Sequence, residues 1–275
     1  MESLAINLIR AGEYVQRFGL RGLLLAVEHQ LKFRMMSGEA RTTKIPVYGE
    51  ISLRPKTSDL ATFREIFVNQ DYDLNAHGIR NLAQAKYDAI RAAGRPPLIV
   101  DAGANVGLAT RQFKHFFPEA DVIVIEPADD SLAIARDNTK GLSGITFRKA
   151  AIWKEDTTVF LEDSVDASAR RVGEGSGSGE GVDAITMTTL LDGREEDLFI
   201  LKIDIEGAES VIFGEDGESA DWLRQAPIVF IEGHDGMSND FGSLAGLLAH
   251  KNYRDGRITT TGPALIIVPR STFDT

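Results

Sequence analysis

The chain has 275 residues, 43% of them hydrophobic, no cysteine and a formal net charge of −11. The acidic balance argues against a nucleic-acid partner, since phosphate contacts need a basic surface. The lack of cysteine excludes disulfides and thiolate metal sites. The N-terminus shows no basic and apolar leader, and its longest apolar run, Leu23 to Val27, is too short to span a bilayer. We therefore expect a cytoplasmic protein without a transmembrane segment.

The first 44 residues are basic, whereas the rest of the chain is acidic. They contain seven Lys or Arg and four acids, a net charge of +3 that leaves −14 for the remainder. Their apolar spacing predicts two amphipathic helices that are broken near Gly19 and Gly22. Such helices suit packing over a sheet domain, pairing in a homodimer, or contact with an anionic membrane face. The basic residues are spread along the sequence, which favours packing or dimerisation over membrane contact.

The segment up to residue 94 contains three further predicted elements. Ile45–Val47 and Ile51–Leu53 are typical of a small hairpin, and Thr57 to Asp59 can cap a helix whose apolar face includes Phe63. Another helix is predicted over residues 79–93, before Gly94. We divide the chain into an extension, residues 1–94, and a ligand-binding domain, residues 95–275. The extension is a candidate lid or dimerisation element.

The second unit opens with a strand, a glycine loop and a helix. Leu98–Val100 forms an apolar run typical of a strand buried on both faces, and Asp101 follows it. Gly103, Asn105 and Gly107 permit a tight turn, and helical periodicity begins at Val106. Such a unit predicts backbone N–H groups and a helix N-terminus that point at a ligand.

The loop differs from the dinucleotide fingerprint, because Asn105 stands where the second glycine would be. Asp101 would repel a pyrophosphate but suits a ligand with an amino group and a sulfonium, such as S-adenosylmethionine (SAM), whose demethylated product is S-adenosylhomocysteine. Glu126 ends the next strand, 25 residues after Asp101, and precedes Pro127. An acid at this spacing favours binding of a ribose diol. A nicotinamide-dependent oxidoreductase, which would bind NAD, is the weaker alternative.

Strands and helices alternate through the rest of the chain. We predict strands at 146–149, 157–161, 184–187, 199–203, 227–231, 253–259 and 264–268, with helices at 129–139, near Trp222 and at 241–250. This order predicts an α/β fold with a doubly wound, mostly parallel sheet and an antiparallel closing hairpin. Ala151 could lie beside an adenine ring or pack in the core. The Gly/Ser-rich stretch 173–181 could be a linker or a gating loop.

Acidic residues follow several of these strands, where ligands of open α/β sheets bind. Asp101, Glu126, Asp204 and Glu232 fall at such ends. His234 is a candidate base, while Asp204, Glu206 and Glu232 could orient it or bind a methyl acceptor. The same acids and the histidine could instead hold a divalent metal ion, which we do not favour.

Four motifs resemble the FkbM family of SAM-dependent methyltransferases. They are DAGANVG (101–107), the Glu126–Pro127 pair, LKIDIEGAE (201–209), and Glu232 with His234 after an apolar strand. The segment 53–74 is similar to the region that precedes the core in bacterial members. The resemblance implies a class I, Rossmann-like methyltransferase fold with a seven-stranded sheet, and usually O-methylation of a sugar or natural product.

By matched position, the resemblance implies that the loop residues Asp101, Gly103, Asn105 and Gly107 and the acid Glu126 bind SAM. We also expect Pro127 and Asp204 to contact the cofactor. The resemblance also implies that Asp204, Glu206, Glu232 and His234 line the acceptor side. We therefore expect a SAM-dependent O-methyltransferase that acts on a small-molecule or glycan-linked hydroxyl. A methyltransferase-like subunit without catalytic activity, whose N-terminal helices recruit partners, is a further alternative.

Overall fold

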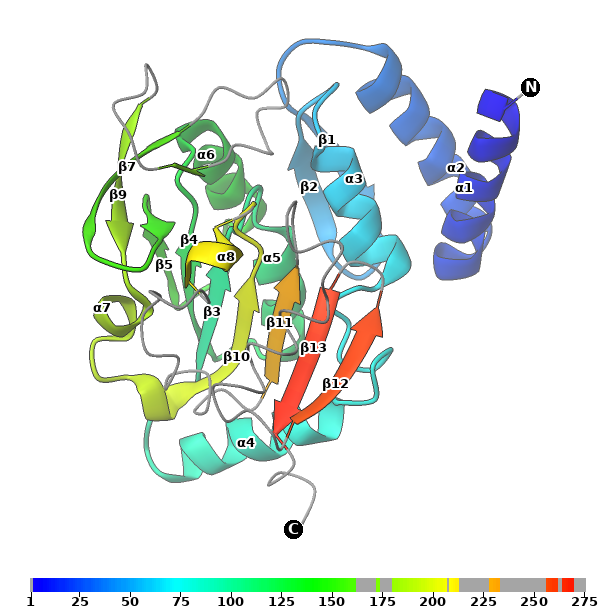
Figure 1. Ribbon diagram of the computed structural model, residues 1–275. Coiled ribbons are helices and arrows are strands. Elements are labelled where there is room, and N and C mark those ends of the chain that lie inside the picture. Colours follow the sequence, from blue (N-terminus) through cyan, green and yellow to red (C-terminus); the bar gives the residue numbers. More distant parts are fainter. Residues whose placement is uncertain are drawn as a thin grey trace.

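A computed structural model describes residues 2–161, 172–173, 180–206, 208–212, 228–232, 256–261 and 264–269 (Figure 1). Five neighbouring strands of its main sheet are parallel. They are β3 (Leu98–Ala102), β4 (Asp121–Ile125), β5 (Ile145–Arg148), β10 (Leu198–Ile203) and β11 (Ile228–Glu232). Two antiparallel strands, β12 (Gly256–Thr261) and β13 (Ala264–Pro269), complete it. The predicted parallel α/β sheet with a closing hairpin is confirmed.

The strand order of the main sheet is β12-β13-β11-β10-β3-β4-β5. Along the chain the sheet grows outward from β3 through β4 to β5, and then on the other side of β3 through β10 to β11. The order therefore reverses between β3 and β10, where an open α/β sheet forms a ligand crevice at the carboxyl ends of its strands. In Figure 1 these ends lie near α8 (Glu209–Ile212), and α4 (Arg80–Ala92) lies at the opposite end of the sheet.

Both faces of the central strands are buried, which explains their continuous apolar runs. On one face, alternate strand residues such as Ile99 and Phe230 pack with Phe113 of α5 (Leu108–Phe116) and with α4. On the other face, Val100 and its neighbours pack with α7 (Met187–Leu191) and α8. Another helix, α6 (Asp129–Asn138), follows β4.

A smaller sheet has the order β6-β9-β7-β8. Its strands are β6 (Ala151–Ile152), β7 (Thr157–Leu161), β8 (Val172–Gly173) and β9 (Gly181–Ile185). The strand predicted over 184–187 is wrong at its end. Thr186 caps α7, because its hydroxyl accepts the N–H of Thr189 at 3.0 Å, and Met187 is therefore helical. Within the stretch 173–181, residues 174–179 lie outside the described residues.

The N-terminal segment begins with α1 (Glu2–Phe18) and α2 (Leu20–His29). Gly19 separates them with a φ of +64°, so the break falls where the sequence predicted it. A π-helical segment η1 (Gln30–Met35) follows, then the hairpin β1 (Arg41–Ile45) and β2 (Gly49–Leu53), α3 (Asp59–Phe63) and η2 (Arg64–Asn69). A short 3-10 helix, η3 (Glu195–Asp197), precedes β10. Figure 1 shows α1 and α2 at the outer edge, beyond β1, β2 and α3.

None of the helices in the described part of the chain has both the length and the hydropathy that a bilayer crossing requires. The helices predicted near Trp222 and over 241–250 lie outside the described residues.

Candidate functional site

The backbone N–H groups of the glycine loop are used inside the protein. Those of Gly103 and Ala104 both donate to the Ile125 carbonyl at 3.0 Å, and that of Gly107 donates to the Ala104 carbonyl at 2.8 Å. The N–H of Asn105 donates to Glu126 Oε2 at 2.8 Å. The prediction that these groups point at a ligand is therefore wrong for these four residues. The loop is tied to the end of β4, which leaves it poorly suited to a diphosphate.

Gly103 is needed where the loop passes the end of β10. Its φ is +74°, and a Cβ atom built on it would lie 1.6 Å from the Asp204 carbonyl oxygen. Gly107 also has a φ of +74°, and its Cβ would lie 3.0 Å from Ala135 of α6. Both glycines thus serve close contacts between segments of this chain.

Glu126 ends β4 directly beside this loop. Its side chain accepts two backbone N–H groups, from Asn105 at 2.8 Å and from Ala128 at 2.9 Å. Burial raises the pKa of Glu126 to about 7, although the two backbone hydrogen bonds oppose the rise. A carboxylate offers about four lone-pair positions. Glu126 therefore keeps acceptor capacity for a diol. Pro127, which follows it, is partly buried.

A buried lysine joins the acids at the ends of β3 and β10. Lys202 Nζ lies 3.4 Å from Asp101 Oδ1 and 3.1 Å from Asp204 Oδ2, and it donates to the Gly103 carbonyl at 2.9 Å. Burial lowers the pKa of Lys202, but Asp204 and Asp101 outweigh this effect and raise it above its ordinary value. Lys202 therefore stays charged and holds the two strand ends together.

Asp101 is completely buried. Its Oδ2 accepts the Thr110 hydroxyl at 2.5 Å, and its Oδ1 faces Lys202. The sequence motifs predicted only carboxylates at this edge, and Lys202 was not among the predicted site residues. A signal was present, because a lysine inside the apolar run LFILKI of a buried strand requires an acidic partner.

The segment after η2 reaches the same edge of the sheet. The Tyr72 hydroxyl donates to Glu232 Oε2 at 3.2 Å, and Lys202 Nζ lies 5.6 Å from the centre of the Tyr72 ring. Burial raises the pKa of Tyr72, and Asp204 and Glu232 raise it further. Tyr72 therefore stays neutral and donates. No sequence motif pointed to Tyr72 as a site residue.

Two carboxyl groups, Glu65 of η2 and Asp71 just after it, have pKa values near neutrality. Burial raises the pKa of Glu65 to about 7, and the charges of Asp204 and Asp71 add to this effect. Burial also raises the pKa of Asp71 to about 6. Carboxyl groups shifted in this way occur preferentially at functional sites. Residues 65–72 thus add titratable groups to the site from outside the sheet.

The remaining predicted site residues fall into different places. Glu206 follows Asp204 with a φ of +55°, so the two lie in the same strand-to-helix turn. Ala151 is buried with Trp153, Val159, Ala184 and Ala208, which is the core alternative considered for it. His234 lies outside the described residues. Among the described residues, the structure contains no group of three or more acids and histidines arranged to hold a metal ion.

Comparison with known proteins adds an independent line of evidence. The methyltransferase FkbM domain matches residues 101–254. No curated protein has significant sequence similarity to the chain. Three similar solved structures are a SAM-dependent methyltransferase from Agrobacterium tumefaciens, a ribosomal protein L11 methylase from Lactobacillus delbrueckii subsp. bulgaricus, and a precorrin-6y C5,15-methyltransferase from Geobacter metallireducens.

All three similarities are distant. The A. tumefaciens structure is 13% identical with a TM-score of 0.44, and the match covers 86% of this chain and 71% of that chain. The L11 methylase is 18% identical with a TM-score of 0.33, and the match covers 69% of this chain and 77% of that chain. The precorrin enzyme is 11% identical with a TM-score of 0.35, and the match covers 70% of this chain and 86% of that chain. The domain match, by contrast, spans more than half of this sequence and includes the β3, β4, β10 and β11 strand ends. The chain therefore belongs to the FkbM methyltransferase family, as the sequence motifs predicted.

Proposed function

We propose that the protein is a SAM-dependent O-methyltransferase that acts on a hydroxyl of a small-molecule or glycan-linked acceptor. Membership of the FkbM family supports methyl transfer and implies SAM as the cofactor. The observation that carries the proposal is Glu126, a buried carboxylate at the end of β4 with acceptor capacity beyond its two backbone hydrogen bonds.

The residues present fit SAM better than a dinucleotide. Glu126 would accept the ribose hydroxyls, and Asp101 with Asp204 gives the crevice a negative balance that one lysine does not cancel. SAM, when bound, supplies an electrophilic methyl group on a positively charged sulfur. In the loop from Gly103 to Gly107, four backbone N–H groups donate to the end of β4 or to the loop itself. The loop therefore offers few hydrogen-bond donors to a pyrophosphate. This favours the methyltransferase over an NAD-dependent enzyme.

The acceptor side needs a group that removes a hydroxyl proton. His234 remains the base proposed from sequence, and Asp204, Glu206 and Glu232 would position it or the acceptor. Glu65 is a second candidate base, because a pKa of about 7 suits proton exchange at neutral pH. Its place on η2, in a segment that contacts Glu232 through Tyr72, supports the proposal that the extension, residues 1–94, acts as a lid.

Isothermal titration tests the cofactor. We expect SAM and S-adenosylhomocysteine to bind and NAD not to bind. Glu126→Gln should weaken SAM binding by about tenfold to a hundredfold, since hydrogen bonds to a charged group contribute about 1.5–3 kcal/mol each. Asp129→Asn, which removes an exposed carboxylate of α6, is the matched control and should leave affinity unchanged. Binding of NAD without SAM would overturn the proposal.

Methyl transfer is tested with SAM and a panel of hydroxyl-bearing acceptors, with the methylated atom identified by NMR. We expect Asp204→Asn, His234→Ala and Glu65→Gln to lower turnover while SAM still binds. The non-catalytic subunit is the competing outcome. It predicts that SAM binds but that none of these changes affects methylation by the assembled system.

A further inference from the structure

The N-terminal helices expose a continuous apolar stripe. Its residues lie on α2 and η1 with exposed fractions between 49% and 86%: Leu20, Leu23, Leu24, Val27, Leu31 and Met35. At helical spacing, the α2 members and Leu31 fall within an arc of about 100°. The opposite side of the same segment is buried through Leu25, His29 and Phe33. The face of α2 and η1 with Leu25, His29 and Phe33 is therefore packed against the protein, whereas the apolar stripe faces solvent.

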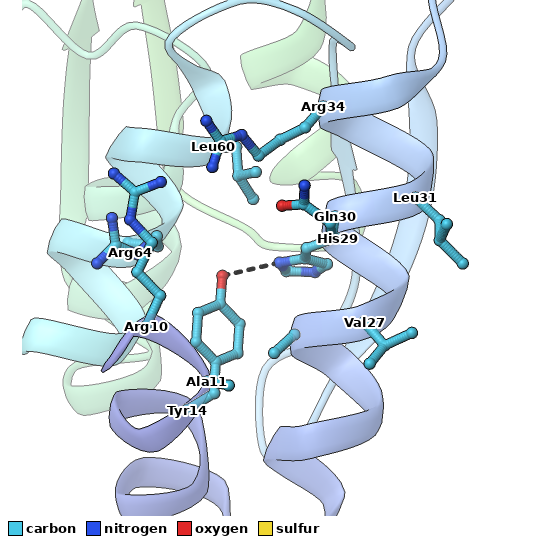
Figure 2. A pocket seen from close by; sticks show the side chains of 11 residues that line it. Arg10, Ala11, Tyr14, Val27, His29, Gln30, Leu31, Arg34, Leu60 and Arg64 are labelled. Atoms are coloured by element: carbon cyan, nitrogen blue, oxygen red, sulfur yellow. Dashed lines mark hydrogen bonds between the residues drawn. The ribbon is translucent and has the colours of Figure 1, made fainter. Parts of the chain in front are cut away.

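A cavity of about 230 Å³ lies between α1, α2 with η1, and the segment of Leu60 and Arg64 (Figure 2). Its base is formed by Tyr14 and His29, whose hydroxyl and Nδ1 lie 3.0 Å apart. Three arginines from different segments line it: Arg10 of α1, Arg34 of η1 and Arg64 of η2.

These arginines carry an excess of positive charge. Burial lowers the pKa of Arg10, and the charges of Arg64 and Arg34 lower it further. Glu13 pairs with Arg64 at 2.6 Å, whereas neither Arg10 nor Arg34 forms an ion pair within the described residues. Arg64 Nε is buried and has no hydrogen-bond partner among them. The cluster therefore suits an anion that accepts several guanidinium hydrogen bonds, such as a phosphate.

The arginine cluster and the apolar stripe share residues. Val27 and Leu31 line the cavity and also belong to the stripe. Figure 2 shows their side chains on the outer side of the helix, pointing away from the arginines. An occupant that covered both features would need an anionic group beside a broad apolar surface. A bilayer of anionic lipids has this combination.

We propose that α2 and η1 dock this protein on an anionic membrane surface, with a lipid phosphate held by Arg10, Arg34 and Arg64. In the sequence, the spread of the basic residues over the first 44 positions favours packing or dimerisation over membrane contact. The fold removes that objection, since Arg64 comes from a distant segment and completes the cluster. A second copy fits less well, because its own N-terminal segment is basic, with a net charge of +3 over residues 1–44, and offers no excess of anionic groups to the arginines.

Vesicle co-sedimentation of the full-length protein tests the proposal, because it does not depend on the methyltransferase activity. We expect binding to vesicles of equal parts phosphatidylglycerol and phosphatidylcholine, loss of binding in high salt, and little binding to phosphatidylcholine alone. The double change Arg10→Gln and Arg34→Gln should weaken binding about 25-fold, since each basic residue near an anionic surface contributes about a factor of five.

The stripe is tested separately with Leu24→Gln and Leu31→Gln, which should weaken vesicle binding at least about tenfold. The controls are Lys140→Gln, an exposed lysine, and Leu142→Gln, an apolar residue that is 37% exposed. Both lie after α6 and should bind as the wild type does. Circular dichroism should show the same helix content in all variants, because every substituted side chain is exposed or partly exposed.

Three outcomes would overturn the proposal. Equal binding to neutral vesicles would show that the arginines do not recognise lipid phosphate. Thermal stabilisation by inorganic phosphate, without binding to any vesicle, would identify a soluble anion as the ligand. A dimer in light scattering that Leu24→Gln and Leu31→Gln dissociate, again without vesicle binding, would assign the stripe to a second copy.

Discussion

Two charged clusters in this chain have opposite signs and different surroundings. At the strand ends, Lys202 lies within 4 Å of two carboxylates, Asp101 and Asp204, so the local balance is negative. Between the N-terminal helices, the three arginines lie with a single paired glutamate, Glu13, and the balance is positive. The difference agrees with the ligand proposed for each site, because a cationic sulfonium suits the first and an anionic phosphate suits the second.

The clusters also differ in how firmly the chain fixes them. The strand-end cluster is built into backbone contacts between β3, β4 and β10, and its central residues are buried. The arginine cluster lies where Arg34 is exposed and the other two arginines are partly exposed. Substitutions should therefore cost much folding free energy at the strand ends and little among the arginines.

Gly103→Ala should produce the largest loss of stability. The added methyl group would overlap the Asp204 carbonyl, and the φ of +74° is unfavourable for alanine. We expect a cost above about 5 kcal/mol, or failure to fold. Gly94→Ala is the matched control, because Gly94 has the same φ and nothing within 4 Å of its Cβ position. It should cost about 1 kcal/mol in urea unfolding. If the two substitutions lowered the unfolding free energy equally, the close contact between Gly103 and the end of β10 would not contribute to the loss of stability.

Lys202→Met should have the next largest effect. It leaves the buried Asp101 and the partly buried Asp204 without their cation, and we expect a cost of about 3–5 kcal/mol by chemical denaturation. Lys149 offers the matched control, because it also pairs with two acids, Asp129 and Glu180, but in solvent. Lys149→Met should hardly change stability. Adding Asp101→Asn to Lys202→Met should restore part of the loss, and absence of any recovery would contradict the pairing.

Much of the sheet could be predicted from the sequence because its signals are local. Apolar runs such as Leu98–Val100 identify strands that are buried on both faces, and the predicted β7 matches the observed Thr157–Leu161. The end of β9 could not be predicted in this way. Thr186 looks like part of an apolar strand, but its hydroxyl caps α7, and that depends on the direction in which the chain turns.

The site was harder to predict, because its chemistry depends on contacts between distant segments. Acids after strands indicated the correct edge of the sheet, since parallel strands end together. The hydrogen bond from Tyr72 to Glu232 joins residues that are 160 positions apart, so no periodicity in the sequence could predict it. The arginine cluster is a similar case, because Arg10, Arg34 and Arg64 meet only after the helices fold back.

His29 gives the helical segment a pH dependence that the strand ends should not share. Burial lowers its pKa to about 4 from the ordinary 6.5, so the folded state binds fewer protons than the unfolded state between these values. The stabilising contribution of the neutral, buried His29 side chain is complete above pH 6.5 and is lost as the pH falls toward 4. We expect a loss of about 3 kcal/mol in unfolding free energy. His29→Gln should remove this slope, and an unchanged pH profile would contradict the assignment.

Glu65 of η2, which interacts with the strand-end residue Asp204, should give the unfolding free energy a smaller pH dependence of opposite sign to that of His29. Burial raises its pKa to about 7 from 4.5, so the folded state holds the proton more tightly. This stabilising contribution is complete below pH 4.5 and is lost as the pH rises through 7. Glu65 is partly exposed, and Glu126 titrates in the same pH range. Glu65→Gln should therefore reduce the change in unfolding free energy between pH 4.5 and 7 by less than about 2 kcal/mol.

Urea unfolding between pH 5 and 8 measures the effect, with Glu119→Gln as a control because that carboxylate is 61% exposed. If Glu65 also takes the acceptor proton, Glu65→Gln should lower turnover and abolish the rise in kcat near pH 7. A stability change without that kinetic change would make Glu65 a lid residue and leave His234 as the base. The comparison of kcat with stability in one variant therefore separates the two roles.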